Sequence, residues 1–350
     1  MPSDPSHRLQ QPPSLAAKVH WLQQPATYPH APQRIEAIET HMSWVFLADE
    51  YVYKLKKPVR RDFLDFSTLE TRHRNCEEEL RLNRRLAPDV YLNVVPLAID
   101  DAATVRLGGR GEVLEWLVRM RRLPAECMLD YAIQHGTARD DEIRRLALRL
   151  AEFYADSAPI RMGPDEYRQR FEADIRATRQ ELLLPRYGLP SDPTECIAAA
   201  QLRFLARNPS LFDQRVYDER IIEAHGDLRP EHICLRPEPV IIDCLEFNRA
   251  LRLLDSADEL AFLALECERL GAPAIGSAIL EICCDALNDA PPQDLVLFYK
   301  SYRAFLRAKL SIWHLRDDDV AQPSKWFNRA LAYLRMAQQY ILETRAPNEP

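Results

Sequence analysis

The apolar residues of this chain change their spacing once, near Pro124, and that change limits what the chain can fold into. Before it, short runs alternate apolar and polar residues, and about five strands fit within 34–124. One helix interrupts them over 67–86, with Ser67 as its N-cap and Glu70 at the capping-box spacing. After Pro124 the apolar residues recur at helical spacing. The pattern predicts an α+β protein with a small β-rich lobe and a large helical lobe.

Three parts follow from this pattern: a Pro-rich tail over 1–35, an N-lobe over 36–124 and a helical C-lobe over 125–345. Within the tail, one short helix is predicted over 15–22. The loops and short strands of 225–248 interrupt the C-lobe helices. The predicted C-lobe helices cover 140–158, 164–184, 193–205, 255–270, 274–288, 294–315 and 324–344.

Composition limits the class of protein. The 350 residues carry a net charge of −7, which argues against a general nucleic-acid binder. No run of 18 apolar residues and no secretory signal are present, so neither a membrane span nor secretion is expected. The eight cysteines form no CxxC pair, which favours reduced thiols in a cytoplasmic protein. The adjacent Cys283 and Cys284 have no His or Cys at ligand spacing, so zinc binding is not expected. The oligomeric state stays open.

The segment most typical of a chemical function is His225-Gly226-Asp227, followed by Asp243 at the end of an apolar run. An Asp in a loop before a strand can orient a hydroxyl nucleophile and accept its proton. A second Asp at the end of the next strand can hold Mg²⁺ against nucleotide phosphates. This pair predicts phosphoryl transfer, although either Asp alone is more often a turn or cap residue.

A second pair of charges lies in the predicted N-lobe. Lys54 ends a strand, and Glu79 falls on the apolar face of the following helix at 100° per residue. A buried carboxylate needs a cationic partner, and Lys54 on the adjacent strand is the nearest candidate. A solvated Glu beside an unrelated Lys is the alternative.

Taken in order, the strand lysine, the helix glutamate, the HGD loop and the strand-end Asp resemble the protein-kinase-like fold. Within it they resemble the aminoglycoside phosphotransferase and choline kinase type of small-molecule kinase, over about residues 36–310. The stretches THMSWVFLADEYVYKLKKPVRRDFLDFSTLETR and VIIDCLEFNRALRLLDSADELAFL resemble more closely an uncharacterised bacterial aminoglycoside-phosphotransferase-family group, sometimes fused to a P-loop kinase domain.

This resemblance implies a role for each matching residue. Asp227 would be the catalytic base and Asp243 the principal Mg²⁺ ligand, while Asp258 would brace the backbone of the catalytic loop. Residues 115–121 would end the last N-lobe strand and form a hinge. The residues implied to hold ATP are Lys54 at the phosphates, Glu79 orienting Lys54, and Val52 and Met120 at the adenine.

Two positions depart from the family pattern. His232 stands where such kinases place a metal-binding Asn, and an imidazole is a poorer ligand than an amide oxygen for Mg²⁺. Glu231 or Glu246 could supply the missing oxygen, or the site could be catalytically impaired. No glycine precedes Gly108, so a Gly-rich phosphate loop is absent, and Ser43 with the amides before it would have to meet the phosphates.

The sequence therefore predicts an ATP- and Mg²⁺-dependent phosphotransferase acting on a hydroxyl of an unidentified small molecule. A pseudokinase that binds nucleotide or serves as a scaffold is the first alternative, because of His232. A protein Ser/Thr kinase is the second, disfavoured by the short segment between Asp243 and the next helix. Among the basic residues of 54–61, all but Lys54 are expected on the surface. Arg303 and Arg307 are expected either at the substrate or in interhelix ion pairs.

Overall fold

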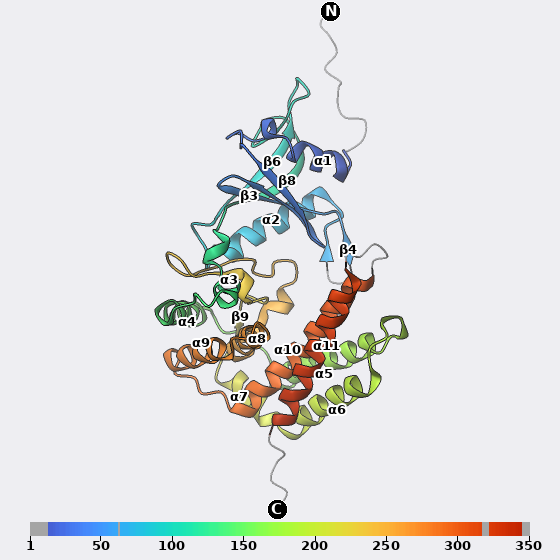
Figure 1. Cartoon of the computed structure of the whole chain (residues 1–350), viewed down its shortest axis with the longest axis vertical. Helices are drawn as coiled ribbons and strands as arrows, with labels where there is room; N and C mark the ends of the chain where they lie inside the picture. The colour runs from blue at the N-terminus through green and yellow to red at the C-terminus, as the bar shows by residue number, and fades with distance from the viewer. Residues whose placement is uncertain (1–12, 62–63, 317–321, 345–350) are drawn as a thin grey trace, which may run out of the picture. The chain divides into compact units, whose positions relative to one another are not determined.

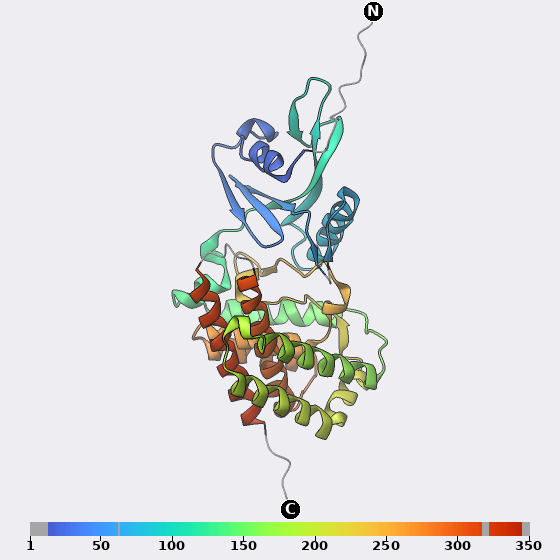
Figure 2. The same ribbon diagram turned by 90° about the vertical axis from the view of Figure 1, so that its right-hand side faces the viewer.

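The computed structural model describes residues 13–61, 64–316 and 322–344 (Figures 1 and 2). Contacts within the chain divide it into two compact units. Unit 1 comprises the described residues of Met1–Cys127 together with Val240–Arg249, and unit 2 those of Met128–Pro239 and Ala250–Pro350. The segment that carries Asp243 therefore packs with the N-terminal unit, although it is distant in sequence.

Unit 1 is built on a six-stranded antiparallel sheet. Val52 on β3 lies opposite Met120 on β8, and Lys54 lies opposite Val118. In spatial order the strands are β1 (Ile35–Glu39), β2 (Ser43–Ala48), β3 (Tyr51–Lys56), β8 (Glu112–Arg121), β6 (Tyr91–Ile99) and β7 (Val105–Leu107). The other strands of unit 1 are β4 (Arg60–Arg61), β5 (Leu64–Asp65) and β11 (Val240–Ile241).

Helices cover both faces of this sheet (Figure 2). On one face, Val19 and Leu22 of α1 (Leu15–Leu22) pack with Tyr53 and Leu55. On the other, Cys76 of α2 (Leu69–Asn83) packs with the cluster that includes Val52, Val118 and Met120. Alternate residues of a strand point to opposite faces, so Val52, Lys54 and Lys56 all face α2. Helix α1, which the sequence placed in the N-terminal tail, thus packs into the core of unit 1.

The start of α2 differs by one residue from the expectation. Thr68, not Ser67, is the N-cap: its Oγ1 accepts from the backbone N–H of Thr71 at 3.1 Å, and Thr71 Oγ1 accepts in return. Ser67 instead donates its hydroxyl to Asp65 at 2.6 Å. Both residues are good caps, and the local bond to Asp65 decides between them.

Unit 2 is mainly helical, as predicted, with α10 and α11 side by side (Figure 1). Its core is rich in aromatic residues, among them Phe171, Phe212 and Phe298. The prediction missed the short helices α3 and α7, because six and nine residues hold too little periodicity to recognise. The helices are α3 (Leu129–Gln134), α4 (Asp140–Ala155), α5 (Pro164–Leu182), α6 (Ser191–Arg207), α7 (Pro209–Tyr217), α8 (Ser256–Arg269), α9 (Pro273–Ala286), α10 (Gln293–Trp313) and α11 (Pro323–Glu343).

Short strands and 3-10 turns frame the loop that carries Asp227. Strand β9 (Ile221–Glu223) precedes it and pairs antiparallel with β12 (Leu253–Asp255), which leads directly into α8. The turn η4 (Pro230–His232) and strand β10 (Ile233–Cys234) follow it. The remaining 3-10 turns are η1 (Pro25–Thr27), η2 (Ala125–Cys127), η3 (Pro185–Tyr187), η5 (Arg249–Arg252) and η6 (His314–Arg316).

Candidate active site

In unit 1, Lys54 joins three elements of the chain. Its Nζ donates to Glu79 Oε1 on α2 at 2.9 Å and to Asp243 Oδ1, just after β11, at 2.8 Å. The Glu79 side chain is wholly buried, whereas that of Asp243 is 44% exposed. The expected contact between Lys54 and Glu79 is confirmed. Asp243 is the most exposed member of this trio and the one that a ligand can reach most readily.

Lys56 forms a second link that the sequence interpretation missed. Its Nζ lies 2.5 Å from Glu79 Oε2 and 2.5 Å from Glu246 Oε1, and its side chain is fully buried. The expectation that Lys56 is a surface residue is therefore wrong. Since residues two apart on a strand face the same side, the alternation that placed Lys54 against the helix could have placed Lys56 there too.

Electrostatic attraction keeps this group charged despite its burial. Burial alone would lower the pKa of Lys54, but the carboxylates of Asp243 and Glu79 raise that pKa well above its usual value. Burial would raise the pKa of Glu79, but Lys54 and Lys56 lower it. Lys54, Lys56 and Glu79 thus remain ionised around neutral pH.

The backbone around Asp243 is held in an uncommon conformation. Asp243 has a φ of 61°, in the left-handed region, and its N–H donates to the Tyr91 hydroxyl at 3.1 Å. The next N–H, of Cys244, donates to Asn83 Oδ1 at 2.9 Å. A strained backbone fixed by side chains of α2 and β6 is typical of functional positions.

The other predicted nucleotide contacts also lie in unit 1. Val52 and Met120 are cross-strand neighbours on the face that α2 covers. Ser43 is 3% exposed, its N–H donates to Thr40 Oγ1 at 3.0 Å, and its carbonyl accepts from Thr40. The backbone of Ser43 is therefore already used in the turn before β2, which leaves little of it for a phosphate.

The segment 115–121, expected to end the last N-lobe strand and form a hinge, lies wholly within β8 and does end at its last residue. Glu115 lies within β8 and is 1% exposed. Its carboxylate accepts from Arg72 Nη2 and from Lys18 Nζ, each at 2.7 Å. Glu115 is therefore a structural link between α1, α2 and the sheet.

In unit 2, Asp227 lies among cationic side chains. Arg229 Nη2 is 2.9 Å from Asp227 Oδ2, and Arg307 Nη1 is 3.8 Å from Asp227 Oδ1. Arg229 Nη1 also lies 2.5 Å from Glu231 Oε1. The Asp227 carboxylate is therefore flanked by fixed positive charge on both oxygens.

His232 uses both ring nitrogens within this loop. Its Nδ1 lies 2.9 Å from the Asp227 carbonyl oxygen, and its Nε2 lies 3.0 Å from Arg229 Nη2. Since a guanidinium can only donate, Nε2 is the acceptor and Nδ1 carries the proton. The geometry fits an imidazole that ties Arg229 to the loop better than it fits a metal ligand.

The residue that braces the loop is Glu259, not Asp258. Glu259, on the first turn of α8, accepts the N–H of His225 at 3.1 Å and that of Gly226 at 2.6 Å. Its neighbour Asp258 instead forms two hydrogen bonds with Arg303, at 2.7 and 2.5 Å. The family resemblance pointed to the right turn of the helix, but the side chain that reaches the loop is one position later.

A Mg²⁺ ion would find part of its ligand set here. Mg²⁺ in phosphoryl-transfer enzymes commonly takes one or two carboxylates, with phosphates and water completing its shell. The exposed Asp243 fits that role, whereas Glu246 is held by Lys56. Among the residues that the structure describes, no group of three or more His, Cys, Asp or Glu side chains is arranged to hold a metal by itself.

Comparison with known proteins bears on the fold. The search against family models found no match. Solved structures that resemble the chain include a choline/ethanolamine kinase family protein from Mesorhizobium loti, with a TM-score of 0.52 and 15% identity over 93% of this chain and 99% of that one. A spectinomycin phosphotransferase, in complex with ADP and spectinomycin, has a TM-score of 0.50 and 12% identity over 94% and 100%. The chain has the protein-kinase-like fold of these structures.

An aminoglycoside 2'-phosphotransferase solved with GDP shares this kinase fold, with a TM-score of 0.50 and 16% identity over 88% of this chain and 93% of that one. The predicted fold class, a β-rich N-terminal part followed by a helical part, is confirmed. The resemblance inferred from the sequence is confirmed at the level of the fold.

Relatives by sequence are longer than this chain. An uncharacterised protein of Mycobacterium tuberculosis strain H37Rv is 33% identical over 281 residues, which are 79% of this chain and 54% of that protein. An uncharacterised protein of Mycobacterium bovis matches to the same extent. The chain thus spans about half the length of the curated relatives it matches. No helix in the described ranges is long and apolar enough to cross a membrane.

Proposed function

We propose that this chain is a phosphotransferase that transfers the γ-phosphoryl group of ATP, with Mg²⁺, to a hydroxyl of a small molecule. The observation that carries the proposal is the convergence of Lys54, Glu79 and Asp243, which come from a strand, a helix and a segment 189 residues from Lys54. The kinase fold supports it, because phosphotransferases with this fold were solved with ADP and with GDP.

Unit 1 would bind the nucleotide. Lys54 carries an ammonium that can turn from Asp243 toward phosphate oxygens, while Glu79, held by Lys56, keeps the lysine in place. Val52 and Met120 would pack against the adenine. The carboxylate of Asp243 would hold Mg²⁺, which supplies neutralisation of phosphate charge during transfer.

Unit 2 would supply the base. Asp227 is positioned to accept a hydrogen bond from the hydroxyl of an acceptor and then its proton. Arg229 fixes the carboxylate through Oδ2, and Glu259 fixes the loop backbone through two N–H groups. The catalytic contribution of these residues is mainly positioning and charge, as in other phosphoryl-transfer enzymes.

A thermal-shift experiment tests the nucleotide site directly. We expect ADP with Mg²⁺ or Mn²⁺ to raise the Tm of the wild type, because a ligand that binds only the native state stabilises it. Asp243→Asn keeps the left-handed backbone, which Asn tolerates, and should remove the metal-dependent part of the shift. A wild type without any shift would contradict the proposal.

Two results would redirect the proposal. A full nucleotide shift with no phosphoryl transfer to any acceptor would favour the pseudokinase alternative, since His232 and Arg229 already occupy the loop around Asp227. A gain of one phosphoryl group in the intact mass of the protein after incubation with ATP would favour a protein kinase.

A further inference from the structure

Two arginines one turn apart on α10 both lie near the Phe262 ring but differ in their carboxylate partners. Arg303 donates from Nε and Nη2 to the two oxygens of Asp258, at 2.7 and 2.5 Å. This is the two-point geometry that satisfies a guanidinium, so Arg303 serves helix packing. Arg307 comes four residues later, on the same face of the helix.

Arg307 has only long ion pairs. Its distances to Asp227 Oδ1 and to Glu266 Oε1 are both 3.8 Å, beyond hydrogen-bond range. Glu266 is already engaged, because Tyr333 donates to its Oε1 at 2.6 Å and Arg269 to its Oε2 at 2.8 Å. Within the described ranges, the buried Nε of Arg307 has no hydrogen-bond partner.

Aromatic rings hold this guanidinium in place. Its Cζ lies 5.8 Å from the ring centre of Phe262 on α8 and 5.9 Å from that of Tyr333 on α11. Such cation–π contacts orient a guanidinium, and Tyr333 also forms a side-chain hydrogen bond with Arg307. The Arg307 side chain is 15% exposed, so a ligand can reach it. The result is a fixed, accessible donor group beside the proposed base.

We propose that Arg307 recognises an anionic group, a carboxylate or a phosphate, on the acceptor whose hydroxyl meets Asp227. This inference rests on the proposed function and specifies its substrate class. A guanidinium presents donors that match the oxygens of either anion. Because Arg307 Nη1 lies 3.8 Å from Asp227 Oδ1, the anionic group must lie within a few bonds of the reacting hydroxyl.

The same geometry disfavours a cationic acceptor. An ammonium group near that hydroxyl would face both Arg229, bound to Asp227 Oδ2, and Arg307 on the opposite oxygen. Like charges held at such distances repel, more strongly where solvent is partly excluded. Hydroxy acids and phosphate esters are therefore favoured over amino alcohols.

A matched set of glycerol derivatives tests the charge requirement. The probes are glycerate, glycerol 3-phosphate, glycerol and 2-amino-1,3-propanediol, whose binding is measured by calorimetry in the presence of ADP and Mg²⁺. We expect an anionic probe to bind at least about tenfold more tightly than glycerol, as one charged hydrogen bond provides. The cationic probe should bind most weakly, and added salt should weaken the anionic probes.

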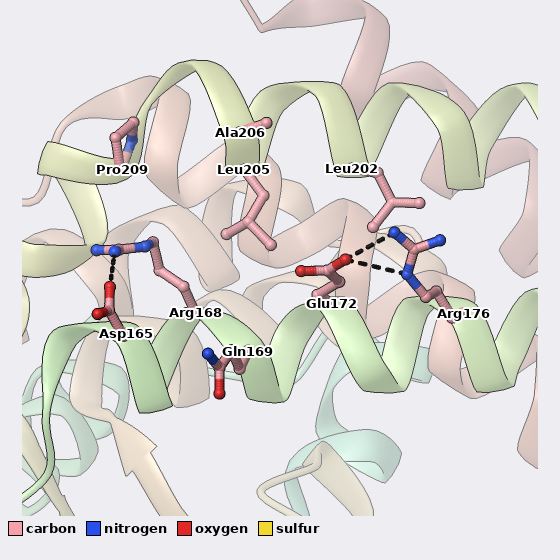
Figure 3. Close-up of a pocket in the computed structure, with 9 residues that line it drawn as sticks. All are labelled: Asp165, Arg168, Gln169, Glu172, Arg176, Leu202, Leu205, Ala206 and Pro209. Carbon is pink, nitrogen blue, oxygen red and sulfur yellow. Dashed lines mark hydrogen bonds and ion pairs between the residues drawn. The ribbon is translucent and has the colours of Figure 1, made fainter.

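Substitutions connect this binding to Arg307. Arg307→Gln should lose about tenfold in affinity for the anionic probes, with Arg307→Lys between it and the wild type, because the lysine keeps charge but not the forked donors. Arg176→Gln is the matched control. Arg176 lies on the hollow of about 330 Å³ between α5 and α6, where it is paired with Glu172 (Figure 3). The Arg176→Gln variant should bind all four probes with the affinity of the wild type.

Several results of these binding experiments would contradict the proposed role of Arg307. Equal affinity for glycerol and both anionic probes, or an unchanged Arg307→Gln variant that keeps its Tm, would overturn the inference. So would an anionic probe that binds without ADP but not in its presence, because the probe would then occupy the nucleotide site. A normal thermal shift with ADP alongside a failed charge preference would remove this inference and leave the proposed function intact. Charge-dependent binding of the probes without any thermal shift by ADP would contradict the proposed function and leave only an anion site at Arg307.

Discussion

The two units carry their charged residues in different ways. In unit 1, Lys54 and Lys56 lie on a regular strand and share Glu79 on a regular helix. In unit 2, Asp227 lies in a loop, and its neighbours come from that loop and from distant helices. Positions on regular elements follow from periodicity, whereas positions in a loop depend on contacts that only the folded chain reveals. A sequence can therefore place the charged residues of unit 1, but it cannot identify the neighbours of Asp227 in unit 2.

The largest expected effect concerns the loop of unit 2. Asp227→Asn removes the base but keeps the size of the side chain, so acceptor-dependent turnover should fall by about 10²- to 10⁴-fold. The thermal shift with ADP and Mg²⁺ should persist, because unit 1 holds the proposed nucleotide contacts. Release of ADP in a coupled assay measures the turnover. Undiminished turnover would show that the base is another residue, and unit 2 would then no longer be the part of the chain that supplies it.

The next effect concerns the shared carboxylate of unit 1. Lys56→Met removes one cation from two buried carboxylates, Glu79 and Glu246, and should lower the free energy of unfolding by about 3–5 kcal/mol. Lys57→Met is its control, since Lys57 pairs with Glu39, whose side chain is 55% exposed, and should cost at most about 1 kcal/mol. Urea unfolding measures both. Equal costs would mean that burial does not distinguish these neighbouring lysines.

The smallest effect concerns acid stability. Hydrogen bonding from Arg236, more than any other contact, lowers the pKa of the buried Glu142 to about 2. A lowered pKa in the folded state adds stability that is complete above the usual pKa of about 4.5 and is lost as the pH falls toward 2. Glu142→Gln should therefore cost about 1–3 kcal/mol at pH 7 and much less near pH 2. Urea unfolding curves at both pH values measure the loss of unfolding free energy. A loss that does not depend on pH would mean that Glu142 contributes through packing and not through its charge.

Sequence reasoning reached the fold and the contact between Lys54 and Glu79 for identifiable physical reasons. The helical spacing of α2 placed Glu79 inward, and its burial required a cation, which is Lys54. The same alternation should have moved Lys56 inward, but a run of basic residues resembled a solvated loop. Thr68 and Ser67 could not be separated, because both are good caps and only the contact with Asp65 decides between them.

The loop of unit 2 was harder to anticipate. Asp258 and Glu259 are adjacent acids on one helical turn, and the side chain that reaches the backbone of His225 depends on the exact rotation of α8. His232 was expected at the metal because of its place in the motif. Its two hydrogen bonds, to the Asp227 carbonyl and to Arg229, involve partners that no spacing rule identifies. The domain boundaries at 35 and 124 and the roles of the predicted site residues stay predictions.

The packing of α1 bears on how this protein can be shortened. Val19 and Leu22 cover apolar residues of the sheet, among them Phe46 and Leu55, which are fully buried. A protein trimmed to begin at the first strand would display that apolar face to water and to its own copies, a condition that promotes association. Truncation experiments, and any attempt to produce unit 1 in isolation, should therefore keep the residues of α1.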